Sequence, residues 1–548
     1  MKPTRKLTWL VTVAVAAGTV AGGLYGPKMQ ATTVAGGDDG DVQSSLQDFT
    51  RIYDIVQREY ADPVDPNKAI YGPENAAAVG AIPGMLRTLD PHSNFFDPHT
   101  FAQLREEQES KYYGVGMTIS ARLDKAGKLA TFVQEPIPGS PAFKAGLRPG
   151  DIIWRVDGKE AEGMNTTQVA DMLKGPKGTV VHVEVEREGY DQAVDFTITR
   201  DQIERPTVDA AFEIKPGIAL IHVNGFDETT DDELAAALQK LGGPNMSNMK
   251  GLILDLRGNP GGLLEEAVDV SDHFLAKDQL IVYHYGRASS EKRYFVHNGN
   301  HGEEYPMVVL IDRYTASAAE IVSGALQDHD RALIMGEPSF GKGLVQTVYP
   351  LSDHAGLALT TAHYYTPSGR LIQRDYSDVS LYDYYNRDED APTPKSQVRL
   401  TDGGREVYGG GGITPDVEVA PPKLNDVQQK LADHDAIYEF AEHYLGVHKT
   451  IPRDFQVTPD VLDEFTRYLG DEHLNVSSAD LNDNADWLKE RIRVQLVGMI
   501  YGADEALKID KETDPLVGKA VESLPQAAAL LQHSKQYVAS RGSQLGER

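Results

Sequence analysis

The sequence predicts an α+β protein built from several domains, and two observations support this prediction. The chain has 548 residues, which exceeds the roughly 250–300 residues at which a single hydrophobic core stops growing. Its pattern also changes along the chain, from helical spacing to short β-type runs, then to alternating strands and helices, and finally to a charged helical stretch. We expect successive parts over residues 1–40, 41–110, 111–205, 206–420 and 421–548.

The composition excludes several kinds of site and partner. The formal net charge of −29 argues against a nucleic-acid partner, because a polyphosphate would be repelled. The chain contains no cysteine, which excludes a thiol nucleophile and thiolate-bound zinc. The 16 histidines include no His-Glu-x-x-His pattern and no tight cluster. We therefore expect neither a metal nor a cofactor.

The first part, residues 1–40, has the pattern of a targeting segment. Lys2, Arg5 and Lys6 form a basic start before an apolar stretch from Leu7 to about Leu24. This length lies between that of a signal peptide and that of a membrane-spanning helix, and no clear small-x-small cleavage site follows closely. We expect an exported protein, in the periplasm or elsewhere in the cell envelope, with this segment either removed or retained as an inner-membrane anchor.

The second part, residues 41–110, is predicted to be a helical segment. Its apolar residues follow helical spacing, as shown by Leu46, Phe49, Ile52, Tyr53 and Val56. Two turn-rich stretches interrupt the pattern, namely Asp62-Pro63 and Leu89-Asp90-Pro91-His92-Ser93.

The third part, residues 111–205, has short β-type runs with one helical segment over Thr167–Leu173. An ordered series of turn and strand residues, Gly139–Ala142, Ala145–Ile153 and Val156–Gly158, resembles a PDZ domain. This resemblance implies a carboxylate-binding loop that consists of Tyr113, Gly114, Val115, Gly116 and Met117. Backbone N–H groups of a glycine-rich loop suit a peptide's terminal carboxylate. The alternative is that Gly114 and Gly116 only form a turn in a spacer domain.

The fourth part, residues 206–420, alternates strands with helices. Strands buried on both faces are predicted for Ile218–Val223, Leu252–Leu256, Val308–Ile311 and Ala332–Met335. Helices are predicted between them for Leu263–Phe274 and Ala318–Leu326. Beyond Pro421 the chain is helical and charged, which suits either a homodimer interface or the docking of another partner.

Three stretches of this fourth part carry residues suited to chemistry: Leu254–Gly262, Tyr314–Ile321 and Gly341–Gln346. The first is a strand that ends in a glycine-rich turn, where backbone N–H groups suit an anion. In the second, Ser317 stands where a strand gives way to a helix, beside free N–H groups. The third contains Lys342, with the neutral Gln346 four residues later.

Each stretch also has a simpler interpretation. Ser317 and Glu320 form the Ser-x-x-Glu pattern of a helix-capping box. The glycine-rich turn resembles an ordinary connection, and Lys342 alone resembles a solvated surface lysine. Gly336–Lys342 also has the spacing of a phosphate-binding loop, but Gly343 replaces the required Ser or Thr and a β-rich stretch follows, which excludes that interpretation.

Together, and in this order, the motifs resemble the carboxyl-terminal processing protease family, whose serine peptidases use a Ser–Lys dyad. The resemblance implies that Ser317 is the nucleophile, Lys342 the base and Gln346 the residue that orients the base. It also implies an oxyanion hole formed by the N–H groups of Gly262 and Ala318, on an α/β core like that of crotonase-type proteins. Further family landmarks are Leu89–Ser93, Thr366–Arg370 and Gly411–Asp416, and the resemblance extends over Phe49–Val419.

The resemblance predicts an endopeptidase whose substrates are proteins or peptides with free C-termini, bound by the PDZ domain. One position departs from the family, since many members have serine where this chain has Ala319. The main alternative is a non-catalytic PDZ adaptor on a hydrolase-like fold, which predicts the loss of Ser317, Lys342 or Gln346, yet all three are present. An acyl-binding protein of crotonase-like architecture conflicts with the exported N-terminus. A Ser–His hydrolase lacks its Gly-x-Ser-x-Gly motif around Ser317.

Overall fold

The computed structural model describes residues 39–59, 64–72, 80–123, 127–187, 189–190, 192–351, 354–377, 379–386 and 396–546. The chain divides into two compact units, residues 1–85 and residues 86–548. Apart from Asp39 and Gly40, the predicted targeting segment lies outside the described residues. Among the helices that are described, none has the length and apolar character needed to cross a membrane.

The described residues of the first unit are mostly helical, as their spacing predicts. The helices are α2 (Asp39–Glu59), α3 (Pro66–Tyr71) and α4 (Ala81–Leu86), whose last residue already belongs to the second unit. Asp65 caps α3 by accepting hydrogen bonds from the N–H groups of Asn67 and Lys68. The expected helical segment of residues 41–110 continues into the second unit, where β1 (Asn94–Phe96) adds a short strand before α5 (Pro98–Gln108).

The part that resembles a PDZ domain forms a six-stranded sheet in the order β3-β4-β5-β7-β8, with β6 paired to β5. Its elements are β2 (Lys111–Gly114), β3 (Met117–Leu123), β4 (Leu129–Pro136), α6 (Pro141–Ala145), β5 (Ile152–Val156), β6 (Lys159–Glu160), α7 (Thr166–Leu173), β7 (Val180–Glu186), β8 (Val194–Thr199) and β9 (Asp201–Glu204). Strand β3 lies at one end of this order, so one of its edges is open to a further strand. Strands β2 and β9 pair with each other where the chain enters and leaves the domain.

The core of the second unit is a sheet in the order β10-β11-β12-β15-β16-β21, parallel from β11 onward. Its strands are β10 (Val208–Lys215), β11 (Ile218–Val223), β12 (Gly251–Asp255), β15 (Met307–Ile311), β16 (Leu333–Gly336) and β21 (Val417–Glu418). Three helices, α8 (Thr230–Gly242), α9 (Leu264–Asp272) and α10 (Ala318–Asp328), connect them, together with the short η1 (Pro244–Met246). Strands β11, β12, β15 and β16 and helices α9 and α10 begin and end within a few residues of the predicted bounds, whereas β10, β21, α8 and η1 were not predicted.

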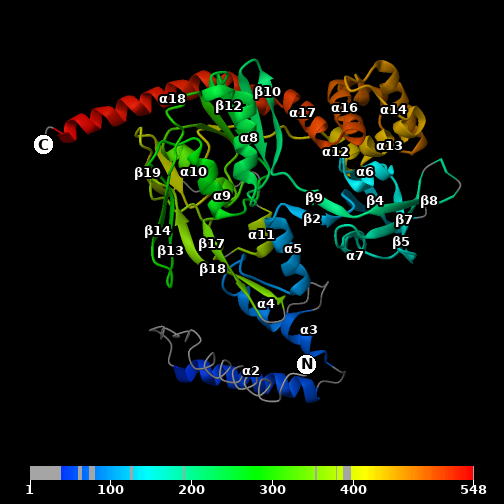
Figure 1. The fold of residues 1–548 in the computed structure, drawn as a ribbon, viewed down its shortest axis with the longest axis horizontal. Coiled ribbons are helices and arrows are strands. Elements are labelled where there is room, and N and C mark those ends of the chain that lie inside the picture. The colour runs from blue at the N-terminus through cyan, green and yellow to red at the C-terminus, as the bar shows by residue number, and fades with distance from the viewer. Residues whose placement is uncertain are drawn as a thin grey trace, which may run out of the picture. The chain divides into compact units, whose positions relative to one another are not determined.

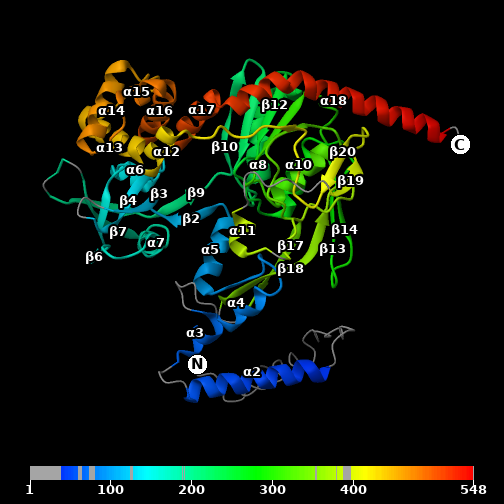
Figure 2. The same cartoon turned by 180° about the vertical axis from the view of Figure 1, so that it is seen from behind.

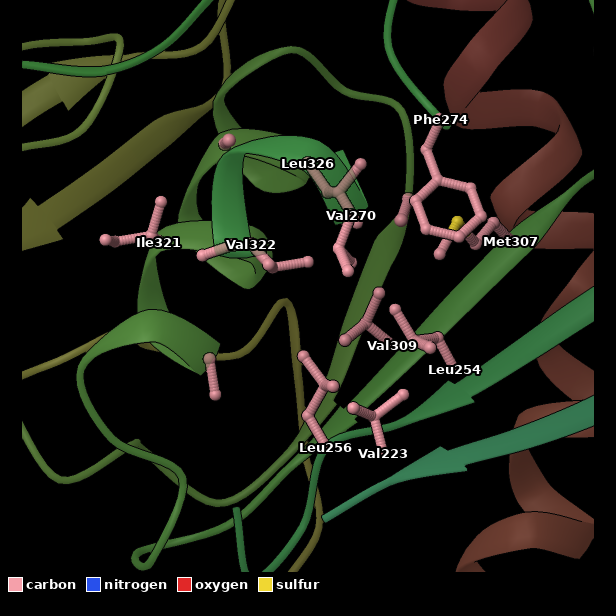
Figure 3. Close-up of a cluster of buried hydrophobic side chains, with 14 of the residues drawn as sticks. Val223, Leu254, Leu256, Val270, Phe274, Met307, Val309, Ile321, Val322 and Leu326 are labelled. Carbon is pink, nitrogen blue, oxygen red and sulfur yellow. The ribbon is translucent and has the colours of Figure 1, made fainter. Parts of the chain in front are cut away.

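Both faces of this sheet are covered, which explains its nearly continuous apolar strands. On one face, Leu254, Leu256 and Val309 belong to one buried cluster with residues of α10, and Val322 of that helix points toward them in Figure 3. On the other face, Ile253 and Leu310 belong to a second buried cluster with residues of the C-terminal helix. This packing fixes the first turn of α10 relative to the ends of the parallel strands.

A second, antiparallel sheet lies in the same unit, in the order β1-β18-β13-β14, with β17 paired to β18. Its strands beyond β1 are β13 (Leu280–Tyr285), β14 (Lys292–Phe295), β17 (Leu344–Pro350) and β18 (Gly356–Tyr365). The short helix α11 (Leu381–Tyr385) and the hairpin of β19 (Ser396–Leu400) and β20 (Glu406–Gly409) complete this region.

The C-terminal part is helical, as predicted. Its helices are α12 (Asp426–Asp433), α13 (Ala436–His448), α14 (Pro459–Asp471), α15 (Ser478–Asp483), α16 (Ala485–Tyr501), α17 (Ala503–Thr513) and α18 (Pro515–Gly546). Helices α12–α16 lie beside the PDZ-like part, and α18 runs past β12, as both views in Figures 1 and 2 show.

Specific contacts join this C-terminal part to the rest of the second unit. The Tyr438 hydroxyl donates to Gln134 O at 3.1 Å, and Arg122 pairs with Glu442 at 3.1 Å. Lys511 Nζ donates to the fully buried Asp255 at 2.7 Å, at the end of β12. The C-terminal helices therefore contact both the PDZ-like part and the α/β core.

We predict that Leu254→Ala lowers the free energy of unfolding by about 2–5 kcal/mol, because it leaves a cavity in a closely packed core. Leu254 is fully buried, whereas Leu424 is exposed and provides a matched control, Leu424→Ala, with an expected change within about 0.5 kcal/mol. Urea denaturation followed by circular dichroism measures both changes. Equal effects of the two substitutions would contradict the assigned packing.

Candidate active site

Ser317 stands immediately before α10, at the helix end where backbone N–H groups are free. Its φ of +53° is unusual for a residue other than glycine. Surrounding bonds hold this conformation, since Ala316 N donates to Asn259 O at 2.9 Å and the Thr315 hydroxyl donates to Leu256 O at 2.9 Å. Ser317 is partly exposed and lines a cavity of about 1100 Å³.

Lys342 and Gln346 line the same cavity. Lys342 Nζ donates to Gln346 Oε1 at 3.0 Å, and Gln346 Nε2 donates to His92 O at 2.6 Å. The amide of Gln346 is thereby oriented with its oxygen toward the lysine. His92 belongs to the Leu89–Ser93 landmark, which thus takes part in the site.

Burial lowers the pKa of Lys342, while the carboxylates of Glu320 and Asp90 oppose this effect. The amide of Gln346 adds a hydrogen bond without adding a negative charge. Leu344, an apolar residue two positions after the lysine, is buried and lines the cavity. Phe340, two positions before the lysine, packs against His92 and Tyr384.

The buried carboxylate of Glu320 connects the two segments that carry Ser317 and Lys342. Its Oε2 accepts hydrogen bonds from Ser317 N at 2.8 Å and from Lys342 N at 2.9 Å. Its Oε1 accepts from Gly341 N at 2.8 Å and from the Ser339 hydroxyl at 2.5 Å. Burial raises the pKa of Glu320, and these four donors oppose the rise.

The fully buried Tyr364 makes a second connection. Its hydroxyl lies 3.0 Å from Ser317 O and 2.5 Å from Lys342 O. No hydrogen bond joins Ser317 Oγ to Lys342 Nζ directly in the described structure. The two residues are therefore positioned through their main chains, in one cavity.

The turn that contains Gly262 lies against Ser317. A Cβ atom on Gly261 would approach Ser317 Cβ to 2.7 Å, and one on Gly262 would approach Phe226 O to 2.1 Å, so both positions require glycine. Gly261 N donates to Asn259 Oδ1 and Leu263 N donates to Phe226 O. Among the described residues, neither Gly262 N nor Ala318 N has a protein acceptor. Two N–H groups beside Ser317 are thus free for a ligand oxygen.

The predicted carboxylate-binding loop lies between β2 and β3, at the open edge of β3. Val115 is buried, and its carbonyl accepts a hydrogen bond from Ala142 N. Gly116 has φ +78°, and the Ser140 hydroxyl donates to its carbonyl at 2.7 Å. Tyr113 is exposed, and Gly114 and Met117 belong to the two flanking strands. The carbonyls of Val115 and Gly116 are therefore hydrogen-bonded within the domain, which fixes the conformation of the loop.

Sequence reasoning missed three residues of this arrangement. The Ser-x-x-Glu pattern predicts only a helix cap for Glu320. The same pattern places a carboxylate three residues after Ser317, and this was the available signal for its role in the site. The His92 carbonyl stands in a recognised landmark whose role was not assigned. Tyr364 has no local signal, because its importance comes from the two carbonyls that its hydroxyl reaches.

Comparison with known proteins gives consistent matches. Residues 217–379 match the sequence model of peptidase family S41, and residues 132–187 match a PDZ domain. A carboxy-terminal-processing protease of Bartonella bacilliformis is 36% identical over 346 residues, which cover 63% of this chain and 76% of that protein. The carboxy-terminal processing protease CtpB of Bacillus subtilis is 32% identical over 351 residues, 64% of this chain and 70% of that protein. Among solved structures, a photosystem II D1 C-terminal processing protease is 29% identical with a TM-score of 0.34, covering 70% of this chain and 95% of that one.

We predict that the Lys342 amine reacts with a lysine-selective acylating reagent at lower pH than the reference compound Nα-acetyl-lysine amide, because burial lowers its pKa and only the neutral amine is nucleophilic. Gln346→Glu places a negative charge beside the ammonium, which favours the charged form. The reaction profile of Lys342 should then move to higher pH by about one to three pH units. Mass spectrometry of the peptide that carries residue 342 measures the profile across the pH range. A profile that matches the reference compound, or that does not move in the variant, would contradict the assigned environment.

Proposed function

Because the chain belongs to the carboxy-terminal processing proteases of peptidase family S41, we propose that Ser317 is the nucleophile of this protease and Lys342 its general base. The family establishes a serine protease with a PDZ domain and supports this function rather than a non-catalytic PDZ adaptor. The observation that carries the residue assignment is the geometry of Lys342. Its amine is held by the neutral Gln346, in the same cavity as a serine at a helix N-terminus.

In the proposed reaction, the neutral amine of Lys342 accepts the proton of the Ser317 hydroxyl as its oxygen attacks the peptide carbonyl. The C–N bond then breaks, Lys342 returns the proton to the leaving amine, and an acyl-enzyme remains on Ser317. Water hydrolyses this ester with Lys342 again as base. Gln346 keeps the amine oriented, and the His92 carbonyl keeps Gln346 oriented.

The N–H groups of Gly262 and Ala318 form the proposed oxyanion hole. Both lack a protein acceptor among the described residues and both border Ser317. Such donors stabilise the negative charge that develops on the carbonyl oxygen, typically by about 3–4 kcal/mol per donor. Glu320 and Tyr364 are positioning residues, because each contacts the main chain of both Ser317 and Lys342.

We also propose how substrates arrive. A substrate C-terminus would add as a strand along the open edge of β3, with its carboxylate at the loop of Tyr113–Met117. Capture by the PDZ domain raises the local concentration of the substrate near the cavity that contains Ser317.

We propose further that the protein acts in the cell envelope, because its N-terminus is basic and then apolar, and that this segment can serve as a membrane anchor. The exposed apolar residues of α2, among them Leu46 and Ile52, support association of two copies.

We predict that Ser317→Ala and Lys342→Ala each lower the rate of casein cleavage by at least about 10³-fold, because either change removes a member of a catalytic unit. Gel electrophoresis measures cleavage, and circular dichroism checks that both variants remain folded. Lys423→Ala, in an exposed segment outside the cavity, serves as the control and should retain full activity. Cleavage at an unchanged rate by either catalytic variant would refute its assigned role.

We predict that the folded Ser317→Ala protein binds a peptide with a free C-terminus at least about tenfold more tightly than the same peptide with an amidated C-terminus. The physical reason is that amidation removes the charge that the loop of Tyr113–Met117 is proposed to bind. Fluorescence anisotropy with labelled peptides measures both dissociation constants. Equal affinities would argue against capture of the carboxylate by this loop.

A further inference from the structure

A row of side chains leads away from Ser317 across the second sheet. In the register of the antiparallel strands, Tyr364 of β18 stands opposite His284 of β13, and His284 stands opposite Lys292 of β14. Residues directly opposite one another share a face of the sheet. Because the Tyr364 hydroxyl reaches Ser317 O, the row begins at the nucleophile's own peptide group. Figures 1 and 2 both show β13 and β14 beside β18.

All members of this row line the cavity that contains Ser317 and Lys342. Tyr294, two residues after Lys292 on β14, lines it as well. The cavity therefore extends from the Ser–Lys pair to the hairpin of β13 and β14. A peptide lying in it would place residues other than those at the scissile bond against this hairpin.

His284 is buried, with 8% of its surface exposed, and one of its ring nitrogens has no partner. Its Nε2 lies 3.3 Å from the Tyr294 hydroxyl, whereas Nδ1 has no hydrogen-bond partner among the described residues. Buried polar atoms are nearly always paired, since leaving one unpaired costs about 1–3 kcal/mol. Because His284 lines the cavity, a ligand there that reaches Nδ1 would supply the missing hydrogen-bond partner.

The surroundings indicate which hydrogen-bonding role Nδ1 has. Burial and the nearby Lys292 lower the pKa of His284, so the ring is neutral and carries one N–H. The Lys292 ammonium lies 4.5 Å from the centre of the Tyr294 ring. A cation beside the phenol favours its oxygen as an acceptor, which leaves the phenol proton for His284 Nε2. The ring proton is then on Nδ1, which acts as a donor.

Lys292 supplies the positive charge at this end of the cavity. Lys292 is exposed and carries a positive charge, and no ion pair joins it to a carboxylate in the described part of the chain. Glu265, at the start of α9, also lines this cavity, and its carboxylate is close enough to Lys292 to favour the charged ammonium. A donor and a cation side by side are the groups that bind a carboxylate.

We propose that His284, Lys292 and Tyr294 form a subsite of the cleft that binds a carboxylate of the substrate. The carboxylate comes from an Asp or Glu side chain near the scissile bond or from the substrate's own C-terminus. This inference rests on the proposed function, because the ligand is a peptide in the same cleft. It makes the β13–β14 hairpin a determinant of specificity, separate from the Ser–Lys pair.

The test uses internally quenched peptides that the unaltered protein cleaves at one mapped bond. Glutamate replaces glutamine at each position around that bond in turn, and a second series compares a free with an amidated C-terminus. We expect glutamate at one position, or the free C-terminus at one distance, to raise kcat/KM by at least about tenfold, as one charge-assisted hydrogen bond would. The two series distinguish the two sources of the carboxylate.

Variants assign the preference to the hairpin. In Lys292→Met the ratio of kcat/KM for the paired peptides should fall to about one, and in Glu265→Gln it should rise, because a repelling carboxylate is removed. Lys277→Met, an exposed lysine that does not line the cavity, is the matched control and should keep the ratio of the unaltered protein. A preference for a free C-terminus that persists in Lys292→Met belongs to the PDZ domain and contradicts the subsite.

Binding to the Ser317→Ala protein separates this inference from the proposed catalysis. If the unaltered protein cleaves nothing but the Ser317→Ala protein still binds the glutamate peptide more tightly, the catalytic assignment fails and the subsite stands. If cleavage proceeds without any glutamate or free-acid preference, or if the preference survives Lys292→Met, the subsite is wrong and the Ser–Lys assignment is unaffected.

Discussion

A single buried carboxylate is the constraint on which the rest of the site depends. Glu320 accepts hydrogen bonds from Ser317 N, Lys342 N, Gly341 N and the Ser339 hydroxyl, and it is completely buried. A buried charge without its donors is strongly destabilising. Moving the loop of residues 339–342 away from the first turn of α10 would therefore raise the free energy of the protein. The spacing between the serine and the lysine is thereby set by main-chain bonds rather than by a direct contact between their side chains. This arrangement has a consequence for the lysine, because the carboxylate that positions Lys342 also opposes the loss of its proton.

The family landmarks acquire a common physical meaning in this structure, since each one fixes part of the same site. Gln346 depends on the carbonyl of His92, from the Leu89–Ser93 landmark. Arg370, from the Thr366–Arg370 landmark, is fully buried and pairs with Asp328 at the end of α10 at 2.6 Å. Ile413 N, from the last landmark, donates to the Ser339 hydroxyl, which in turn donates to Glu320. Motifs that are far apart in the sequence therefore hold one helix and one loop.

The C-terminal helices bind the PDZ domain and the α/β core into one unit. Arg122 of the PDZ domain lies between the rings of Phe132 and Tyr438, at 4.5 and 4.4 Å from their centres, and pairs with Glu442. At the core, Asp255 accepts from Arg257 and Lys511 directly before the glycine-rich turn of Gly261 and Gly262. The part of the chain without a recognised motif thus contacts both the domain proposed to capture substrate and the strand that leads to the proposed oxyanion hole.

The sequence by itself determined the central parallel strands, the helices between them and their order, and it indicated Ser317 and Lys342 as the candidate catalytic pair. Hydrophobic period and turn residues are local properties, so β12, α10 and α7 fall within a few residues of their predicted bounds. Only the tertiary structure decided what surrounds that pair. The bond from Gln346 to His92 spans 254 positions, and the bond from Lys342 N to Glu320 spans 22. No local pattern encodes such distances, and the Ser-x-x-Glu sequence would look the same in an ordinary helix cap. The row of Tyr364, His284 and Lys292 likewise exists only through strand register, because β18 must pair with the β13–β14 hairpin, which is distant in the sequence, before the three side chains share one face.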